Sequence, residues 1–243
     1  MNTADVDTRA PTNVRETRGF WRVLLAIVLP IPWLAKGIQY IVLAPASGNS
    51  ADQIKDWTQD RVYSWVQWLD VLFVVLVVPS IITMALVSRR GAPRLATAAA
   101  IVMGGGFLMV LPLNIGGDPL VWVAARQGYD PTMTGKFIDA LREDPRVGLG
   151  GLGFITAITI GSVLIGLALW KSRAVPAWAA ALVGLGGLTH PFLSFEHHIH
   201  GAGLVVLAIG CAAVGTALLK MSNDEYDLPP LAHGQTCPAR PNR

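Results

Sequence analysis

The chain has 243 residues, of which 52% are hydrophobic and only 14% are charged. A soluble domain usually carries about 25% charged residues, so this composition favours a protein whose middle faces lipid. The formal net charge of +3 is small and dispersed, and we expect no nucleic-acid partner. The two cysteines match neither a disulfide framework nor the spacing of a zinc finger.

The first apolar stretch covers residues 20–44 and follows a polar N-terminal segment, residues 1–19, that we expect in the cytoplasm. Pro30 and Pro32 interrupt the stretch, and it contains Lys36. It is longer than the apolar core of a signal peptide, and no clear cleavage site follows it. We therefore predict a retained first membrane helix.

Five further apolar stretches follow, each long enough or nearly so to cross about 30 Å of hydrocarbon. Backbone groups in lipid must find their hydrogen-bond partners within the segment, so these stretches should be helices. The prediction is an all-α, polytopic bundle of about six transmembrane helices, forming one domain over residues 20–220. The predicted spans are residues 20–44, 65–87, 95–115, 149–170, 175–192 and 199–219.

Lysine and arginine in the short loops indicate the orientation of the bundle. Basic residues precede the first span, separate the second from the third and the fourth from the fifth, and follow the sixth. These residues are Arg9, Arg15, Arg18, Arg22, Arg89, Arg90, Arg94, Lys171, Arg173 and Lys220. The alternation predicts a multi-pass protein of the cell membrane with both termini in the cytoplasm.

The long segment between the third and fourth spans is predicted to lie outside. In residues 131–145 the apolar side chains of Met133, Phe137, Ile138 and Leu141 recur at helical spacing, with charged residues between them. This pattern predicts a short amphipathic helix at the membrane surface.

Two other segments have a distinct composition. Residues 119–125 are apolar but too short to span, so we expect them to dip into the interface or to pack on the bundle. Residues 221–243 are polar and rich in proline, which predicts a disordered cytoplasmic tail.

Ionisable side chains inside a membrane are costly, so each is a functional candidate. Lys36 lies in the outer half of the first span, and Gln39 and Tyr40 share its helix face. Asp70 lies at a similar depth in the second span, with Gln67 one turn earlier. We predict an intramembrane ion pair between Lys36 and Asp70, with either a structural or a functional role.

Four of the five histidines lie in residues 189–200, which include the turn between the last two spans and the adjoining helix ends, together with Glu196. If the sixth helix starts near Glu196, then Glu196, His197 and His200 share one face and His198 points elsewhere. Imidazole and carboxylate groups bind zinc, iron or copper. A metal site of His190, Glu196, His197 and His200 is therefore one interpretation. The alternatives are a wet interfacial turn with capping histidines and a pH-sensing site.

These candidates converge on a polar pocket in the outer half of the bundle, and three function classes follow. The favoured one is a non-catalytic binding, sensing or accessory-subunit role, with the lipid bilayer and a lipophilic small molecule or another membrane protein as partners. The second is an enzyme for a lipid or isoprenoid-like substrate, with Glu196, His197, His200 and Asp70 as metal or acid–base groups. The third is a proton- or ion-coupled transporter that uses Lys36 and Asp70.

Overall fold

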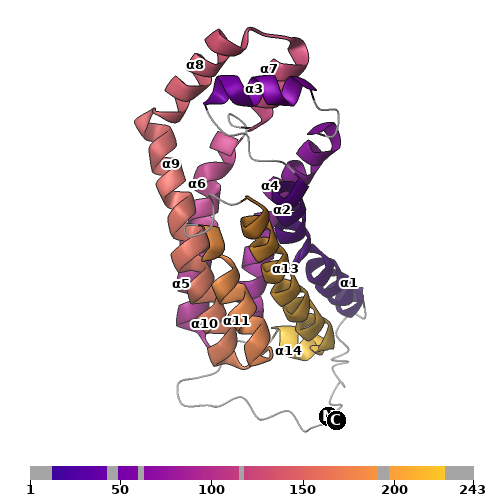
Figure 1. The fold of residues 1–243 in the computed structure, drawn as a ribbon. Coiled ribbons are helices and arrows are strands. Elements are labelled where there is room, and N and C mark those ends of the chain that lie inside the picture. Colours follow the sequence, from indigo (N-terminus) through magenta and orange to yellow (C-terminus); the bar gives the residue numbers. More distant parts are fainter. Residues whose placement is uncertain (1–12, 43–48, 60–62, 115–117, 191–196, 228–243) are drawn as a thin grey trace, which may run out of the picture.

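A computed structural model describes residues 13–42, 49–59, 63–114, 118–190 and 197–227, and every element assigned within them is a helix (Figure 1). Within these described residues, five helical runs are long and apolar enough to cross a membrane. They are Thr17–Val42, Trp65–Ser88, Pro93–Val110, Pro145–Ser172 and His198–Lys220. The chain is thus compatible with a multi-pass membrane protein, while its orientation stays a prediction.

The predicted fifth span, residues 175–192, is shorter in the structure. Its helix α11 covers Ala177–Gly186, and this apolar helix has only 10 residues. Beyond Gly186 the backbone forms tighter turns, with the Leu188 N–H donating to the Leu185 carbonyl at 3.0 Å. Six spans therefore remain a prediction that rests on α11 and on residues 191–196, which lie outside the described part of the chain.

The first span consists of two helices, α1 (Asn13–Val28) and α2 (Ile31–Val42). The chain is already helical before residue 20, so part of the predicted polar N-terminal segment belongs to α1. The break falls at Pro30, and Pro32 follows it; both lack the N–H that a continuous helix needs.

A hydrogen-bonded chain fixes this break to the second span, α4 (Tyr63–Ser88). Ser80 Oγ donates to the Leu29 carbonyl at 2.8 Å, and Trp33 Nε1 donates to Ser80 Oγ at 3.0 Å. Membrane helices tolerate a proline break where a neighbouring side chain binds the freed backbone groups in this way.

The third and fourth spans each contain a π-helical turn, η1 or η2, and the two turns pack against each other. A π-turn shifts the helix face that follows it. The third span consists of α5 (Pro93–Ala99), η1 (Ala100–Gly104) and α6 (Gly105–Asn114). The fourth consists of α9 (Pro145–Thr156), η2 (Ala157–Gly161) and α10 (Ser162–Ser172). The last span is α13 (His197–Lys220).

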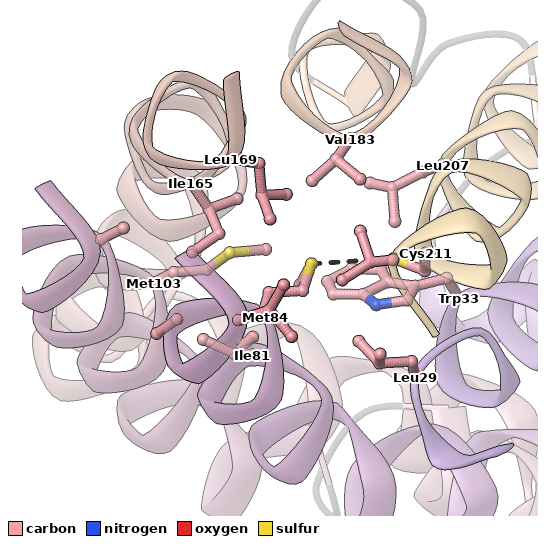
Figure 2. Close-up of a cluster of buried hydrophobic side chains, with 14 of the residues drawn as sticks. Leu29, Trp33, Ile81, Met84, Met103, Ile165, Leu169, Val183, Leu207 and Cys211 are labelled. Atoms are coloured by element: carbon pink, nitrogen blue, oxygen red, sulfur yellow. Dashed lines mark hydrogen bonds between the residues drawn. The ribbon is translucent and has the colours of Figure 1, made fainter. Parts of the chain in front are cut away.

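An apolar core fills the centre of the bundle (Figure 2). Met84 and Cys211 point toward each other there, with Cys211 Sγ 3.8 Å from Met84 Sδ. Leu207 and Val183 close the core from α13 and α11, and all four side chains are buried. These side chains pack α4, α11 and α13 against one another.

Three short helices lie at one end of the bundle (Figure 1), and their buried side chains form a second, smaller core with the start of α4. These helices are α3 (Ser50–Gln59), α7 (Asp118–Gln127) and α8 (Pro131–Arg142), and we call them the cap. The buried residues of this second core are Ile54, Trp57, Val66, Val121, Ala124, Ala125 and Ile138. The cap defines one end of the molecule, which we call the cap end.

Helix α8 forms where the amphipathic pattern predicts a helix, but its apolar residues do not share one environment. Ile138 is buried in the second core, whereas Met133 is 77% exposed and Phe137 is 66% exposed. Gly135 allows the close approach to α3, because a Cβ there would lie 2.6 Å from the Ala51 nitrogen. The position of α8 at a membrane surface stays a prediction.

The opposite end of the molecule carries the basic turns around Arg89 and Arg173, and we call it the arginine end (Figure 1). Helix α14 (Asn223–Asp227) also lies there, within the segment predicted to be disordered. Arg18 Nη1 lies 2.5 Å from Asp227 Oδ2, and Arg89 Nη2 donates to the Tyr226 carbonyl at 2.8 Å. The beginning of the predicted tail is thus ordered against the bundle.

Candidate functional site

The first part of the site is the ion pair between α2 and α4. Lys36 Nζ lies 2.6 Å from Asp70 Oδ1, and the two side chains are 11% and 8% exposed. The ammonium group also lies 5.2 Å from the Tyr40 ring centroid and 5.5 Å from that of Phe73. Attraction to the carboxylate and the ring faces offsets part of the cost of removing this cation from water.

The second part is a pair of histidines. His200 lies in the first turn of α13, and His190 lies four residues after the end of α11. His190 Nδ1 lies 3.1 Å from His200 Nε2. Thr189 Oγ1 donates to the Gly186 carbonyl at 2.7 Å and lies 3.5 Å from His200 Nδ1. Because the Thr189 proton is already donated, the contact is consistent with a His200 ring that carries its proton on Nδ1 and donates it to Thr189. His200 Nε2 is then the acceptor for His190.

Ring contacts join the two parts. The Tyr40 ring lies 4.7 Å from the His200 ring, edge to face. Helices α2 and α13 come this close because Gly37 and Gly201 face each other: a Cβ on Gly201 would lie 2.7 Å from the Gly37 carbonyl oxygen. We call Lys36, Tyr40, Asp70, Thr189, His190 and His200 the polar cluster. Two predicted sites thus form one unit that links α2, α4 and α13 with the turn that follows α11.

Space within the polar cluster is small. A cavity of about 10 Å³ lies between its side chains, which is room for about one water molecule. His190 is covered on another side by the Phe154 ring, at a centroid distance of 4.9 Å. The lining residues are Trp33, Lys36, Tyr40, Phe73, Phe154, Ile158, His190, His200 and Leu204.

Two buried amides lie next to the ion pair. Gln39 follows Lys36 by one turn and Gln67 precedes Asp70 by one turn, so the antiparallel helices place them at the same level. Their side-chain oxygens and nitrogens are buried and have no hydrogen-bond partner among the described residues. Buried amides without partners are rare, and a bound water or polar species is a common reason for them.

The residues predicted to bind a metal are only partly brought together. His190 and His200 meet, while Glu196 lies outside the described residues and the side chain of His197 is not described either. His198 points away, as expected, and its Nδ1 donates to the Ile41 carbonyl at 3.0 Å. The described residues contain no group of three or more His, Cys, Asp or Glu side chains that could hold a metal.

Some members of the site had weak signals in the sequence. Phe73 follows Asp70 by three positions on α4 and therefore shares its face. Thr189 adjoins His190 in sequence. Phe154 gave no signal, because a single aromatic residue in an apolar span is typical of ordinary packing.

Among the described residues, the cavity within the polar cluster measures about 10 Å³ and is lined by ionisable and aromatic side chains. No protein-family model matches this chain, and the comparisons with curated proteins and with solved structures gave no match. Function is therefore inferred from the geometry of the chain itself.

Proposed function

We propose that this protein is a non-catalytic membrane protein that senses protons through the polar cluster, with the cap end facing outward. The observation that carries the proposal is the contact between His190 Nδ1 and His200 Nε2 at 3.1 Å. This distance fits a hydrogen bond in which one imidazole donates and the other, unprotonated at that nitrogen, accepts. Histidine is the side chain whose charge ordinarily changes near neutral pH.

The surrounding charges determine what a further proton does. With both imidazoles protonated, two donors and two positive charges would face each other, and the hydrogen bond would be lost. Lys36 adds a third positive charge from α2, and Asp70 on α4 already binds that lysine at 2.6 Å. The polar groups of the other described neighbours, Tyr40 and Thr189, are uncharged. Acidification is therefore expected to separate Thr189 and His190, which follow α11, from the start of α13.

The size of the cavity supports a small bound species over a lipid substrate. About 10 Å³ accommodates a water or a proton, and an isoprenoid or acyl chain needs far more. The core around Met84 and Cys211, which lies toward the arginine end, is apolar and gives no support to a polar path through the bundle. Sensing thus accounts for the cluster without the larger cavity that a lipid substrate needs or the polar path that transport needs.

The experiment is hydrogen–deuterium exchange of the purified chain in lipid nanodiscs at about pH 7.5 and about pH 4, because the burial of His190 and the nearby charge of Lys36 oppose protonation of its ring. After correction for the intrinsic pH dependence of exchange, acid should increase exchange in peptides covering residues 186–190 and 198–204. His200→Gln should abolish this difference, because glutamine does not titrate. The matched control is His198→Gln, which changes a neighbouring histidine outside the cluster and should keep the difference.

Acidic groups elsewhere should not produce the same response. The Arg146 side chain, and then the Arg146 backbone N–H, donate to Asp144 and lower the pKa of its carboxyl to about 2. Asp144 therefore stays ionised across the experiment. An acid response that survives His200→Gln, or no response in the unmodified protein, would refute the proposal.

One observation favours a second candidate, a metal-dependent membrane enzyme. Two nitrogens bound to one tetrahedral zinc ion lie roughly 3.3 Å apart, given zinc–nitrogen bonds of about 2.0–2.1 Å. The 3.1 Å between His190 Nδ1 and His200 Nε2 is close to that spacing. Metal analysis of the purified protein separates the two functions: a stoichiometric metal that is lost in both His200→Gln and His197→Ala would support the enzyme.

A further inference from the structure

A second feature lies toward the arginine end of the molecule, on the outer surface of α10 and α11. A groove of about 400 Å³ runs between these helices. Gly166 and Gly184 form part of its lining, and a Cβ on Gly166 would lie 2.7 Å from the Gly184 Cα. Leu167, Trp170 and Leu185 border the groove and are exposed. The groove is thus apolar, elongated along the helices and open.

A second cavity, of about 340 Å³, continues the groove at the arginine end. Trp170 and Ala177 line both, so the two spaces adjoin. Lys171 and Arg173 line the second cavity only, and both side chains are exposed. In the described part of the chain neither of them forms an ion pair or a side-chain hydrogen bond, so two cations face the cavity without a carboxylate partner.

The turn between α10 and α11, which carries Arg173, has a strained backbone conformation. Arg173 has a φ of 53°, a left-handed conformation that glycine adopts freely and arginine rarely does. The turn is closed by the Arg173 N–H, which donates to the Trp170 carbonyl at 3.2 Å. The next helix, α11, starts at Ala177 without a side-chain cap, which leaves backbone N–H donors at the same turn.

We propose that this surface binds one anionic phospholipid. The phosphate group lies against Lys171 and Arg173, and an acyl chain lies in the groove above Gly166 and Gly184. Charge complementarity sets the choice of an anionic lipid, because two unpaired cations meet the headgroup where the apolar groove begins. Basic pockets between membrane helices bind anionic headgroups in the same manner. The lipid site is independent of the proton-sensing function and is built from none of its residues.

The test is native mass spectrometry of the purified full-length protein titrated with phosphatidylglycerol or phosphatidylcholine. The protein should bind phosphatidylglycerol more tightly. Each basic residue near a membrane surface contributes an attraction equivalent to about fivefold in affinity. Arg173→Gly should therefore weaken phosphatidylglycerol binding about fivefold, and adding Lys171→Gln should bring the loss to about 25-fold.

Arg173→Gly also separates lipid binding from folding. Glycine relieves the left-handed conformation, so the thermal stability of the variant in detergent should be unchanged or higher while its lipid affinity falls. Ala181→Leu, which fills the groove from its exposed side, should weaken the binding of both lipids. The two substitutions thus distinguish the headgroup contact from the acyl-chain contact.

The matched control is Arg94→Gln combined with Lys220→Gln. It removes the same charge from the arginine end, at residues that line neither cavity. This control should bind phosphatidylglycerol like the unmodified protein. Equal affinity for the two lipids, or an equal loss in the control and in the Lys171/Arg173 variant, would overturn the proposal.

Discussion

The two halves of the bundle differ in chemistry although the same helices run through both. Toward the cap end, α2, α4, α11 and α13 meet through charged and hydrogen-bonded side chains, with the pair of Lys36 and Asp70 at its centre. Further along, the same helices meet through an apolar core that includes Met84 and Cys211 (Figure 2). The helices thus pack through apolar contacts in one half of the bundle and through polar contacts in the other, and we propose that the polar contacts serve the function.

The strongest test of this contrast removes one charge of the ion pair. Lys36→Met leaves Asp70 buried without a partner and should lower the free energy of unfolding by about 3–5 kcal/mol. Adding Asp70→Leu should recover much of the loss, because two apolar residues replace the pair. Unfolding of the purified protein in detergent micelles measures both effects. The control is Lys55→Met, at an exposed ion pair with Asp52, where the change should be below about 1 kcal/mol.

A smaller loss of stability is expected when α2 and α13 are pushed apart at their facing glycines. Gly201→Val places side-chain atoms against the Gly37 carbonyl and Ile41, which should lower the free energy of unfolding by about 1–3 kcal/mol. Because Tyr40 then moves away from His200, the acid-dependent hydrogen exchange should fall as well. Gly151→Ala is the control, since a Cβ there meets no atom within 4 Å. A normal acid response in Gly201→Val would show that the Tyr40 contact is not needed.

The hydrogen bonds at the break between α1 and α2 should contribute less to the free energy of unfolding. Ser80→Ala removes the donor to the Leu29 carbonyl and the acceptor for Trp33 Nε1. The expected loss is about 1–3 kcal/mol, at the low end if a water replaces the hydroxyl. Unfolding in micelles measures it, and Thr216→Ala, whose exposed hydroxyl donates to the Ala213 carbonyl of its own helix, is the matched control. An equal loss in both variants would mean that the break is not held by Ser80.

The smallest effect is expected in the apolar core. Met84→Leu keeps the volume and the apolar character of a fully buried side chain and should cost less than about 1.5 kcal/mol. It should leave the acid-dependent hydrogen exchange near residues 186–190 unchanged. A change in that exchange would mean that the two halves of the bundle are coupled, and the contrast drawn between them would be wrong.

Much of the fold follows from hydropathy alone, because membrane spans need long apolar runs and a lipid environment allows little else. The spans at residues 65–87 and 199–219 agree closely with α4 and α13. The cap was harder to predict. Helix α3 buries only Ile54 and Trp57 as large side chains, and a pattern that sparse is hidden among charged residues.

The candidate site shows where the sequence stops being informative. Depth along the membrane normal can be read from position in a span, and it placed Lys36 and Asp70 on one level. Helix rotation and the pairing of distant helices cannot be read in this way. The contact of Tyr40 with His200 depends on the facing glycines at Gly37 and Gly201, which lie far apart in the chain. The union of the two predicted sites therefore required the structure.

The most direct test of the account is the nitrogen-15 spectrum of the histidine rings in the folded protein, followed from about pH 7.5 to about pH 4 because burial and Lys36 oppose protonation of His190. We expect His200 to carry its proton on Nδ1 at the higher pH, with Nε2 accepting from His190. The two rings should then change together on acidification. If His190 and His200 titrate independently, and replacing one leaves the signals of the other unchanged, the polar cluster is not a proton-sensing unit.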